Sequence, residues 1–267
     1  MTYSYTQISQ YLACPRRYRY RYLDGWREKD TRASMIFGRV FEDALAGYFR
    51  QEDCGQVFLQ GWSRYQQEPL AYPKSDNWEG MLREGLLLLQ QLVKDGRIRI
   101  QDPRHSLQVK SLRRLPPHDD FVAYIDAIGR LDGIRCLMDW KTTGSRYPEG
   151  VGNFFSLDPQ LVCYSWVTGI RDVALILFVR KRIPEIQYLQ TTITDSQRCE
   201  FGELVAHAIR QIESGHFLPH SGIRFPQNAC LSCPYLGLCA QNQQLIDARL
   251  LPRTGAEGRD WLDQLAY

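Results

Sequence analysis

Apolar positions recur at helical spacing in some stretches of the chain and in alternating or continuous runs in others. Helical spacing covers residues 36–50, 77–94 and 196–214, and Gly215 ends the last of these. Residues 173–179 form a continuous apolar run, which is typical of a strand buried on both faces. Capping residues mark one more helix, because aspartate binds the free amides of a first turn and proline fits its first position. This helix starts at Asp158-Pro159 and runs to about Thr168, with Gly169 as its stop.

The stretch 121–143 is predicted to be a β-hairpin. Two runs rich in β-formers flank the dipeptide Asp132-Gly133. This dipeptide suits a type I′ turn, because that turn needs positive φ at both central positions. Residues 101–115 are predicted to contain a further strand, residues 116–120 a turn, and residues 186–193 a last strand. The order of elements predicts an α/β fold, with a mixed central β-sheet flanked by helices.

Asp126, Asp139 and Lys141 are the candidate chemistry of this hairpin. Antiparallel pairing about the turn places Asp126 opposite Asp139, and Lys141 shares the face of Asp139. Like charges directly opposite destabilise a sheet, so a purely structural hairpin would avoid them. A divalent cation removes this cost, since Mg²⁺ is bound by carboxylates together with water and phosphate oxygens. The alternative is a solvated hairpin face with scattered charges.

The segment 1–24 combines aromatic and basic residues. Ser4 or Thr6 is a candidate cap for a first helical turn, and Pro15 fits the first position of a second helix. The Arg-Tyr alternation from 17 to 22 fits either that helix or a strand. Basic residues interleaved with aromatics suit a nucleic-acid backbone and its bases. The alternative is an amphipathic helix with its tyrosines packed inward and its arginines solvated. The candidate contacts to nucleic acid are Arg16, Arg17, Tyr18, Arg19 and Arg21.

Length and charge restrict the class of protein only loosely. The 267 residues suffice for one large domain or two small ones, and a net charge of +3 permits nucleic-acid binding without arguing for it. No run of 18 apolar residues occurs, and the N-terminus lacks a signal-peptide pattern. We therefore expect a cytoplasmic protein without membrane partners.

Eight cysteines without a secretory signal indicate metal or redox use for some of them rather than a disulfide framework. Three of them have the spacing C-x₂-C-x₅-C, which indicates a metal site with one position left to fill. A four-thiolate set holds either a [4Fe–4S] cluster or Zn²⁺, and spacing does not decide between them. His216 and His220 are rival zinc ligands, although surface positions suit them better. The three closely spaced cysteines are Cys230, Cys233 and Cys239. The others outside the N-terminal segment, interpreted as small buried hydrophobic residues, are Cys54, Cys136, Cys163 and Cys199.

Taken together, these motifs resemble the RecB-like branch of the PD-(D/E)XK nuclease superfamily. Within it they are similar to the iron–sulfur exonucleases of the CRISPR-adaptation and AddB nuclease-domain type. Asp126 stands in the first acidic position, and Asp139-Trp140-Lys141 is the D-x-K. The family's G-x-x-x-H helix resembles residues 38–42, where Glu42 replaces the histidine. Its Q-x-x-x-Y helix corresponds to Gln160 and Tyr164.

The resemblance also implies a restriction-endonuclease-like core whose N- and C-terminal segments are joined by a metal cluster. The family's fourth cluster ligand comes from an opening Cys-Pro, which is Cys14-Pro15 here. The implied organisation is a single nuclease domain over 1–267. Residues 1–35 and 216–240 then form the cluster subdomain, 36–215 the nuclease core, and 241–267 a peripheral tail. The implied ligands of a 4Fe-4S cluster are Cys14, Cys230, Cys233 and Cys239.

The activity implied by the resemblance is that of a Mg²⁺- or Mn²⁺-dependent deoxyribonuclease. An exonuclease on single-stranded DNA or overhangs is expected, in DNA repair, recombination or CRISPR adaptation, with protein partners from such a complex. Metal lowers the pKa of a bound water and polarises the scissile phosphate, while an ammonium group stabilises the developing charge. The implied metal ligands are Glu42, Asp126, Asp139 and the Trp140 carbonyl, and the other implied catalytic residues are Lys141, Gln160 and Tyr164.

Two other classes of function stay open. One is a non-catalytic nucleic-acid-binding scaffold that keeps the fold and the cluster; glutamate at position 42 favours it, and the intact Asp126, Asp139 and Lys141 argue against it. The other is a different metallohydrolase, or a zinc protein without a role on nucleic acid. Visible absorption of anaerobically purified protein separates iron–sulfur from zinc, and a Mn²⁺-dependent digestion of labelled DNA separates a nuclease from a scaffold.

Overall fold

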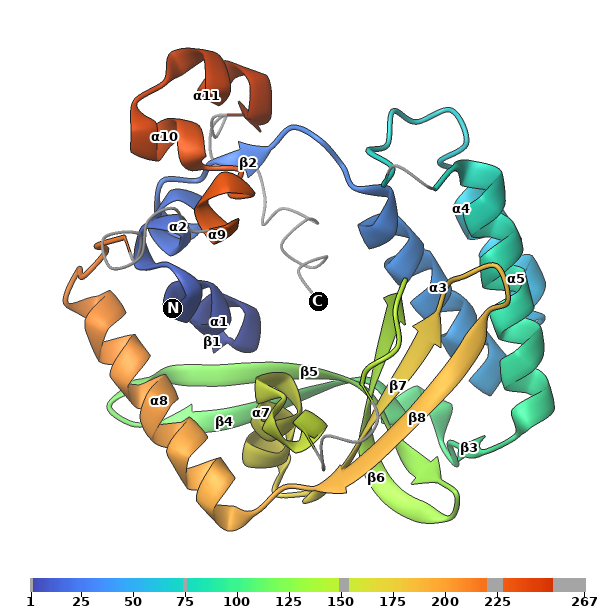
Figure 1. The fold of residues 1–267 in the computed structure, drawn as a ribbon. Helices are drawn as coiled ribbons and strands as arrows, with labels where there is room; N and C mark the ends of the chain where they lie inside the picture. Colours follow the sequence, from blue (N-terminus) through green and yellow to red (C-terminus); the bar gives the residue numbers. More distant parts are fainter. Residues whose placement is uncertain (1, 74–75, 149–153, 220–227, 252–267) are drawn as a thin grey trace. The chain divides into compact units, whose positions relative to one another are not determined.

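The computed structural model describes residues 2–73, 76–148, 154–219 and 228–251 (Figure 1). The chain divides into two compact units. Unit 1 contains Arg32–Glu203, and unit 2 contains Tyr3–Thr31 together with the chain from Leu204 onward. His220, part of the predicted 216–240 segment and most of the predicted 241–267 tail lie outside the described residues. The organisation as one nuclease domain with a cluster subdomain stays a prediction.

Unit 1 opens with three helices, two of which the apolar spacing predicts. Asn77 caps the third, because its side chain accepts a hydrogen bond from the Gly80 amide at 2.7 Å. Gly96 ends that helix with φ +57°, in the left-handed region that favours glycine. The second helix begins at the cap Asp53 and was not predicted. These helices are α3 (Ala33–Phe49), α4 (Cys54–Ser63) and α5 (Trp78–Asp95). Among all described helices, none has both the length and the apolar composition to cross a membrane.

The sheet of unit 1 is mixed, as predicted. Its strands follow the order β4-β5-β6-β7-β8, and β3 also pairs with β5. The β6–β7 pair is parallel and the pairs β4–β5, β5–β6 and β7–β8 are antiparallel. A short helix, α6 (Pro103–Ser106), precedes β4 within the stretch predicted as strand. The strands are β3 (Ile98–Arg99), β4 (Leu107–Leu115), β5 (His118–Leu131), β6 (Ile134–Thr143), β7 (Asp172–Val179) and β8 (Glu185–Thr192).

The β5–β6 hairpin has the predicted turn and register. Asp132 and Gly133 have φ of 50° and 86°, the two positive values that a type I′ turn requires. The backbone ladder runs from the pair Leu131–Ile134 to the pair Ala127–Met138. This register fixes which side chains of β6 share a face.

The two faces of the sheet carry different partners. On one face, alternate residues of β6 and β7 join the core formed with α3, α4 and α5; they are Cys136, Met138, Ala174, Ile176 and Phe178. The opposite face is covered by α7 (Pro159–Thr168). Because side chains alternate along a strand, Asp139 and Lys141 point to the α7 face.

Both ends of α7 are fixed by residues that the sequence marks. The Asp158 carboxylate accepts hydrogen bonds from the amides of Gln160 and Leu161, at 2.8 and 3.3 Å. Gly169 ends the helix with φ +80°. A one-turn 3₁₀ helix, Phe154–Leu157, precedes α7. The predicted helix from Asp158-Pro159 to Gly169 is confirmed.

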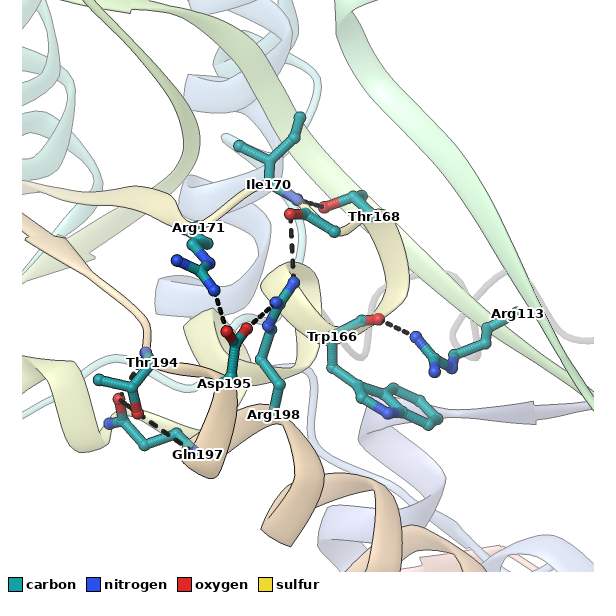
Figure 2. Close-up of polar contacts among 10 residues, drawn as sticks. Arg113, Trp166, Thr168, Ile170, Arg171, Thr194, Asp195, Gln197 and Arg198 are labelled. Atoms are coloured by element: carbon teal, nitrogen blue, oxygen red, sulfur yellow. Dashed lines mark hydrogen bonds and ion pairs between the residues drawn. The ribbon is translucent and has the colours of Figure 1, made fainter.

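The helix α8 (Asp195–Glu213) begins in unit 1. Only its first half belongs to this unit, because unit 1 ends at Glu203. Asp195 is bound by both Arg171 and Arg198 (Figure 2). Arg198 also donates a hydrogen bond to the Gly169 carbonyl at 3.2 Å. The Arg198 side chain therefore joins the end of α7 to the start of α8.

Unit 2 begins with a helix that Ser4, rather than Thr6, caps through a capping box with Gln7. Pro15 occupies the first position of the next helix, as predicted. The Arg-Tyr alternation is helical rather than extended. The elements are β1 (Tyr3–Ser4), α1 (Tyr5–Ala13), α2 (Pro15–Tyr18), the π-helix Arg19–Leu23, β2 (Arg27–Glu28), α9 (Asn228–Leu231), α10 (Leu236–Ala240), α11 (Gln243–Arg249) and β9 (Leu250–Leu251), with β2 and β9 antiparallel.

Candidate active site

Four side chains from β6 and α7 form a closed ring of polar contacts. Lys141 Nζ lies 2.7 Å from Asp139 Oδ2 and donates to Gln160 Oε1 at 2.8 Å. Gln160 Nε2 donates to Tyr164 Oη at 2.7 Å, and Tyr164 Oη donates to Asp139 Oδ1 at 3.4 Å. Asp139 and Tyr164 are each only 1% exposed. The D-x-K strand and the Q-x-x-x-Y helix therefore meet in one site, in which the Lys141 ammonium group is held between Asp139 and Gln160.

Asp126 is positioned by the hairpin in a different way from the one predicted. The backbone ladder of β5 and β6 stops at Ala127–Met138. Beyond it, Asp126 Oδ2 accepts a hydrogen bond from the Trp140 amide at 2.7 Å. Asp126 and Asp139 are thus neighbours without forming a ladder pair, because the Asp126 side chain takes the amide that lies next to Asp139.

Glu42 is the third carboxylate of the site. It lies on α3 and accepts a hydrogen bond from the side-chain amide of Gln108 on β4. Burial raises the pKa of Glu42, and the nearby charge of Asp139 raises it further, whereas the Gln108 and Asp126 contacts lower it. The glutamate at the family's histidine position therefore faces the two aspartates.

The carboxylates share an unfavourable electrostatic environment. Burial raises the pKa of Asp126 well above its ordinary value, and the charges of Asp139 and Glu42 add to the effect. Burial likewise raises the pKa of Asp139, against the opposing influence of Lys141. For Lys141, burial lowers the pKa, but the carboxylates of Asp139, Asp126 and Asp158 together raise it, and the net direction is upward. Three carboxylates around one ammonium group make a site that favours a further cation or protons.

The chemistry of this donor set fits a hard divalent cation, which prefers carboxylate oxygens. Among the described residues, no three His, Cys, Asp or Glu side chains already stand in a metal-binding arrangement. The carboxylates are held instead by protein donors: the Trp140 amide, Lys141 and the Gln108 amide. Trp140 contributes its N–H here, while its ring stacks on Phe49 with centroids 6.1 Å apart.

The four cysteines of the predicted cluster all belong to unit 2 and are free thiols. Burial raises the pKa of the Cys233 thiol, and the charges of Cys239 and Cys14 raise it further, so Cys233 lies within electrostatic reach of each of these two thiols. The Cys230 carbonyl accepts a hydrogen bond from the Cys233 amide at 3.1 Å. A four-thiolate geometry is absent among the residues that the structure describes.

The other predicted cysteine environments are partly confirmed. Cys54, Cys136 and Cys163 are buried, as expected of small hydrophobic residues. The same interpretation is wrong for Cys199, which is exposed on α8. The buried stripe of α8 includes Phe201, Val205, Ala208 and Ile209, and Cys199 lies outside it. The rival zinc ligand His216 uses its carbonyl to accept the Tyr11 hydroxyl at 2.8 Å.

The predicted nucleic-acid contacts of unit 2 divide into buried and exposed residues. Tyr18 is completely buried and packs against Tyr11, Tyr22 and Phe217, so its ring has no free face for a base. Its place among the candidates is corrected: the inward-packed alternative is right for this tyrosine. Arg19 is exposed and bound to Asp24 at 3.4 Å. The other candidates, Arg16, Arg17 and Arg21, are half-buried.

Three residues near the site were not predicted. Gln108 contacts Glu42, as described above. The backbone of Tyr147 is held on both sides by Gln187, which accepts from its amide at 3.0 Å and donates to its carbonyl at 3.1 Å. Burial and then the charge of Asp158 raise the pKa of Tyr147. The sequence offers one signal for these residues: Gln187 is a polar residue within the predicted strand 186–193, and the structure buries it.

Comparisons with known proteins bear on the family and the fold. The profile of the PD-(D/E)XK nuclease superfamily matches residues 2–240. Among solved structures, a candidate exonuclease from Eubacterium rectale is similar over 98% of this chain and 92% of its own, with a TM-score of 0.55 and 13% identity. A structure of LHK-Exo in complex with dAMP covers 68% of this chain and 91% of its own, at 12% identity and a TM-score of 0.33, too low to carry an argument. No curated protein matches the sequence.

The structural likeness supports the fold, while the sequence match extends over most of the chain and includes every residue of the ring. The chain therefore belongs to the PD-(D/E)XK nuclease superfamily.

Proposed function

We propose that the chain is a divalent-metal-dependent deoxyribonuclease. The observation that carries this proposal is the closed ring of Asp139, Lys141, Gln160 and Tyr164. In it the ammonium group of Lys141 is held by the Asp139 carboxylate and the Gln160 amide oxygen, and Tyr164 links these two partners. A chain that merely retained the fold would not need to keep a buried aspartate and a lysine in mutual contact.

The residues divide the work of phosphodiester hydrolysis between them. Glu42, Asp126 and Asp139 would hold Mg²⁺ or Mn²⁺, which would supply a bound water of lowered pKa and a polarised phosphate. Lys141 stays protonated at neutral pH, because its pKa is raised, and its ammonium group stabilises charge on the phosphate. Gln160 and Tyr164 hold the orientation of Lys141 and Asp139. The Trp140 carbonyl, a ligand by resemblance, belongs to the same proposal.

More specifically, we propose that the chain acts as an exonuclease on single-stranded DNA or overhangs. The proposed setting is DNA repair, recombination or CRISPR adaptation, with protein partners from such complexes. It is supported by the resemblance of the motifs to the RecB-like iron–sulfur branch. The [4Fe–4S] cluster on Cys14, Cys230, Cys233 and Cys239 is proposed on the same basis. Cys233 lies within electrostatic reach of both Cys14 and Cys239, which supports their binding one cluster. Arg16, Arg17, Arg19 and Arg21 are proposed DNA contacts of the same unit.

A digestion of end-labelled DNA tests the proposed activity. Purified protein is incubated with Mn²⁺ and either single-stranded or duplex oligonucleotides, and products are resolved over time. We expect Asp139→Asn and Lys141→Ala each to lower the cleavage rate by at least about 100-fold, because each removes charge at the centre of the site. DNA binding, measured by fluorescence anisotropy, should largely survive.

The exposed pair Lys181–Glu185, at 2.6 Å, offers a matched control. Lys181→Ala removes a lysine that also contacts a carboxylate but lies outside the ring, so the cleavage rate should stay at the wild-type level. Undiminished cleavage by Asp139→Asn or Lys141→Ala would show that the ring is not the active site. Tight DNA binding without cleavage by the wild type would support the scaffold alternative instead.

A further inference from the structure

We propose that Gln108 is a positioning residue that holds Glu42 in the orientation needed to bind the divalent cation. This inference rests on the proposed function and adds to it a residue that no motif includes. The structure shows the contact directly: the Gln108 side-chain amide donates to Glu42 Oε1. Glu42 in turn interacts with Asp126 and feels the charge of Asp139.

The backbone of Gln108 is unusual for a strand residue. Its φ is +51°, in the left-handed region that residues other than glycine rarely adopt. The neighbouring pairs Leu107–Ala127 and Val109–Ile125 keep the β4–β5 register, but Gln108 has no place in the ladder. The residue opposite this gap in the register is Asp126. An irregularity of β4 therefore falls at the metal-ligand position of β5.

Strained conformations of this kind persist where the surroundings hold them, and they cluster at functional sites. Here the left-handed backbone coincides with a side chain that crosses to α3. Leu107 points into the core formed with α3, so regular alternation would turn the Gln108 side chain to the opposite face of the sheet. The irregularity instead accompanies a contact of Gln108 with Glu42 on α3.

The chemistry of the amide suits the task. A side-chain amide is a neutral donor, so it fixes one oxygen of a carboxylate without neutralising its charge. A lysine or arginine in this place would form an ion pair with Glu42 and compete with the cation. Gln108 thus orients Oε1 of Glu42. The carboxylate keeps its full negative charge, and its second oxygen is available to a metal ion. Hydrogen-bonding partners of carboxylate ligands commonly act in this way.

The decisive measurement is the affinity for Mn²⁺ by isothermal titration calorimetry, on the full chain without an affinity tag. Gln108→Gly removes the side chain and accepts the positive φ, whereas Gln108→Ala removes the same side chain and keeps the strain. We expect both variants to bind Mn²⁺ roughly 10-fold more weakly, the lower end of the effect of losing such a partner. Cleavage at saturating Mn²⁺ should change much less than the metal affinity. Gln108→Gly should melt at a higher temperature than Gln108→Ala, because only glycine relieves the strain of the positive φ.

Gln51 provides the matched control, because it is also an exposed glutamine with a positive φ, +67°, but follows the end of α3 away from the carboxylates. Gln51→Gly and Gln51→Ala should leave the Mn²⁺ affinity unchanged. The double variant with Glu42→Gln separates positioning from general structure. In the Glu42→Gln background, Gln108→Gly should have no further effect on Mn²⁺ affinity, because the two residues act through one contact.

The outcomes distinguish the two levels of the proposal. Wild-type Mn²⁺ affinity in both Gln108→Gly and Gln108→Ala, in folded proteins, overturns the role of Gln108 and leaves the proposed nuclease intact. An additive loss in the Glu42→Gln background also overturns it, since the effect would then not pass through Glu42. A wild-type chain that binds no Mn²⁺, with or without DNA, overturns the proposed function itself and the role of Gln108 with it.

Discussion

Lys141 shows how a half-buried side chain is kept charged. Burial would lower its pKa, yet the Asp139 carboxylate 2.7 Å away, together with Asp126 and Asp158, reverses the direction. Gln160 then accepts from the same ammonium group at 2.8 Å. Neutral and charged acceptors together leave the ammonium group little freedom to reorient, which is the preorganisation that a charge-stabilising residue requires.

The tyrosine of the ring provides a test at this scale. Tyr164→Phe removes the hydroxyl that accepts from Gln160 and donates to Asp139, and leaves the buried ring in place. We expect the cleavage rate to fall about 10-fold, because Gln160 and Asp139 lose a shared partner. The free energy of unfolding should fall by about 1–2 kcal/mol, measured by denaturation in urea.

Tyr188→Phe is the control for this substitution. Tyr188 also donates to an aspartate, Asp95, at 3.0 Å, but this contact is exposed, and Tyr188 packs against the core on the face of the sheet opposite the ring. The control should change stability slightly and leave cleavage unaffected. Equal cleavage by Tyr164→Phe and wild type would mean that the hydroxyl does not hold the site.

The sequence predicts some residues of the site and misses others for a physical reason. The spacing of two along a strand puts Asp139 and Lys141 on one face, and the spacing of four along a helix does the same for Gln160 and Tyr164. Each pair therefore follows from the period of its element alone. Gln108 lies far from Glu42 in sequence, and its contact arises from one unusual dihedral angle. No periodic pattern encodes such an angle. Tyr18 was misplaced because alternation with arginine is also typical of a helix with an inward-facing ring.

At the scale of elements, side-chain chemistry at the ends of helices was the most informative signal. Asp158, Gly169 and Asn77 mark ends that the structure confirms, because capping groups act on the nearest turn and depend little on the rest of the fold. The helix α4 was missed even though Asp53 caps it. Its buried residues, Cys54, Phe58 and Trp62, recur at helical spacing, so the pattern of a short helix is present in the sequence.

Two glycines in this group of helices should respond to alanine with opposite signs. A Cβ at Gly85 would lie 2.4 Å from the Phe58 ring, which is completely buried against Phe37 and Phe41. We expect Gly85→Ala to lower the free energy of unfolding by about 1–3 kcal/mol through overpacking, in excess of the gain in helix propensity.

At Gly38 of α3, a Cβ would meet only the Thr142 Oγ1 atom, at an ordinary 3.5 Å. Gly38→Ala should therefore stabilise the protein by up to about 1 kcal/mol, the difference in propensity between the two residues. Thermal melts of both variants check the pair. A stabilising Gly85→Ala would mean that Phe58 can move, and that this part of the core is less tightly packed than its burial indicates.

At the scale of the whole molecule, the chain joins two units with different kinds of stabilisation. Unit 1 has a large apolar core around its mixed sheet. Apart from the second half of α8, the described part of unit 2 is made of short helices and short strands, and short elements of this kind often depend on a metal or disulfides. The order of elements in unit 1 was predictable from alternating patterns. The assignment of Tyr3–Thr31 to the same unit as the chain end was implied only through the resemblance.

The proposed cluster gives a prediction at this scale. Cys14→Ser should remove the visible absorption of anaerobically purified protein and its iron, because one of four ligands is lost. Metal binding contributes to folding free energy, so unit 2 should lose several kcal/mol and become sensitive to protease before residue 30. Cys199→Ser, an exposed cysteine of unit 1, is the matched control and should change none of these. Full iron content in Cys14→Ser would place the fourth ligand elsewhere.

The ring that joins β6 to α7 also has a consequence for the equilibrium of local opening. Two of its four members, Gln160 and Tyr164, belong to α7, so any fluctuation that lifts this helix breaks the ring and leaves only its Lys141–Asp139 contact. The catalytically competent population then equals the population in which α7 is docked. Amide hydrogen exchange along residues 161–168 therefore reports, in a single free energy, how often the enzyme is ready to act.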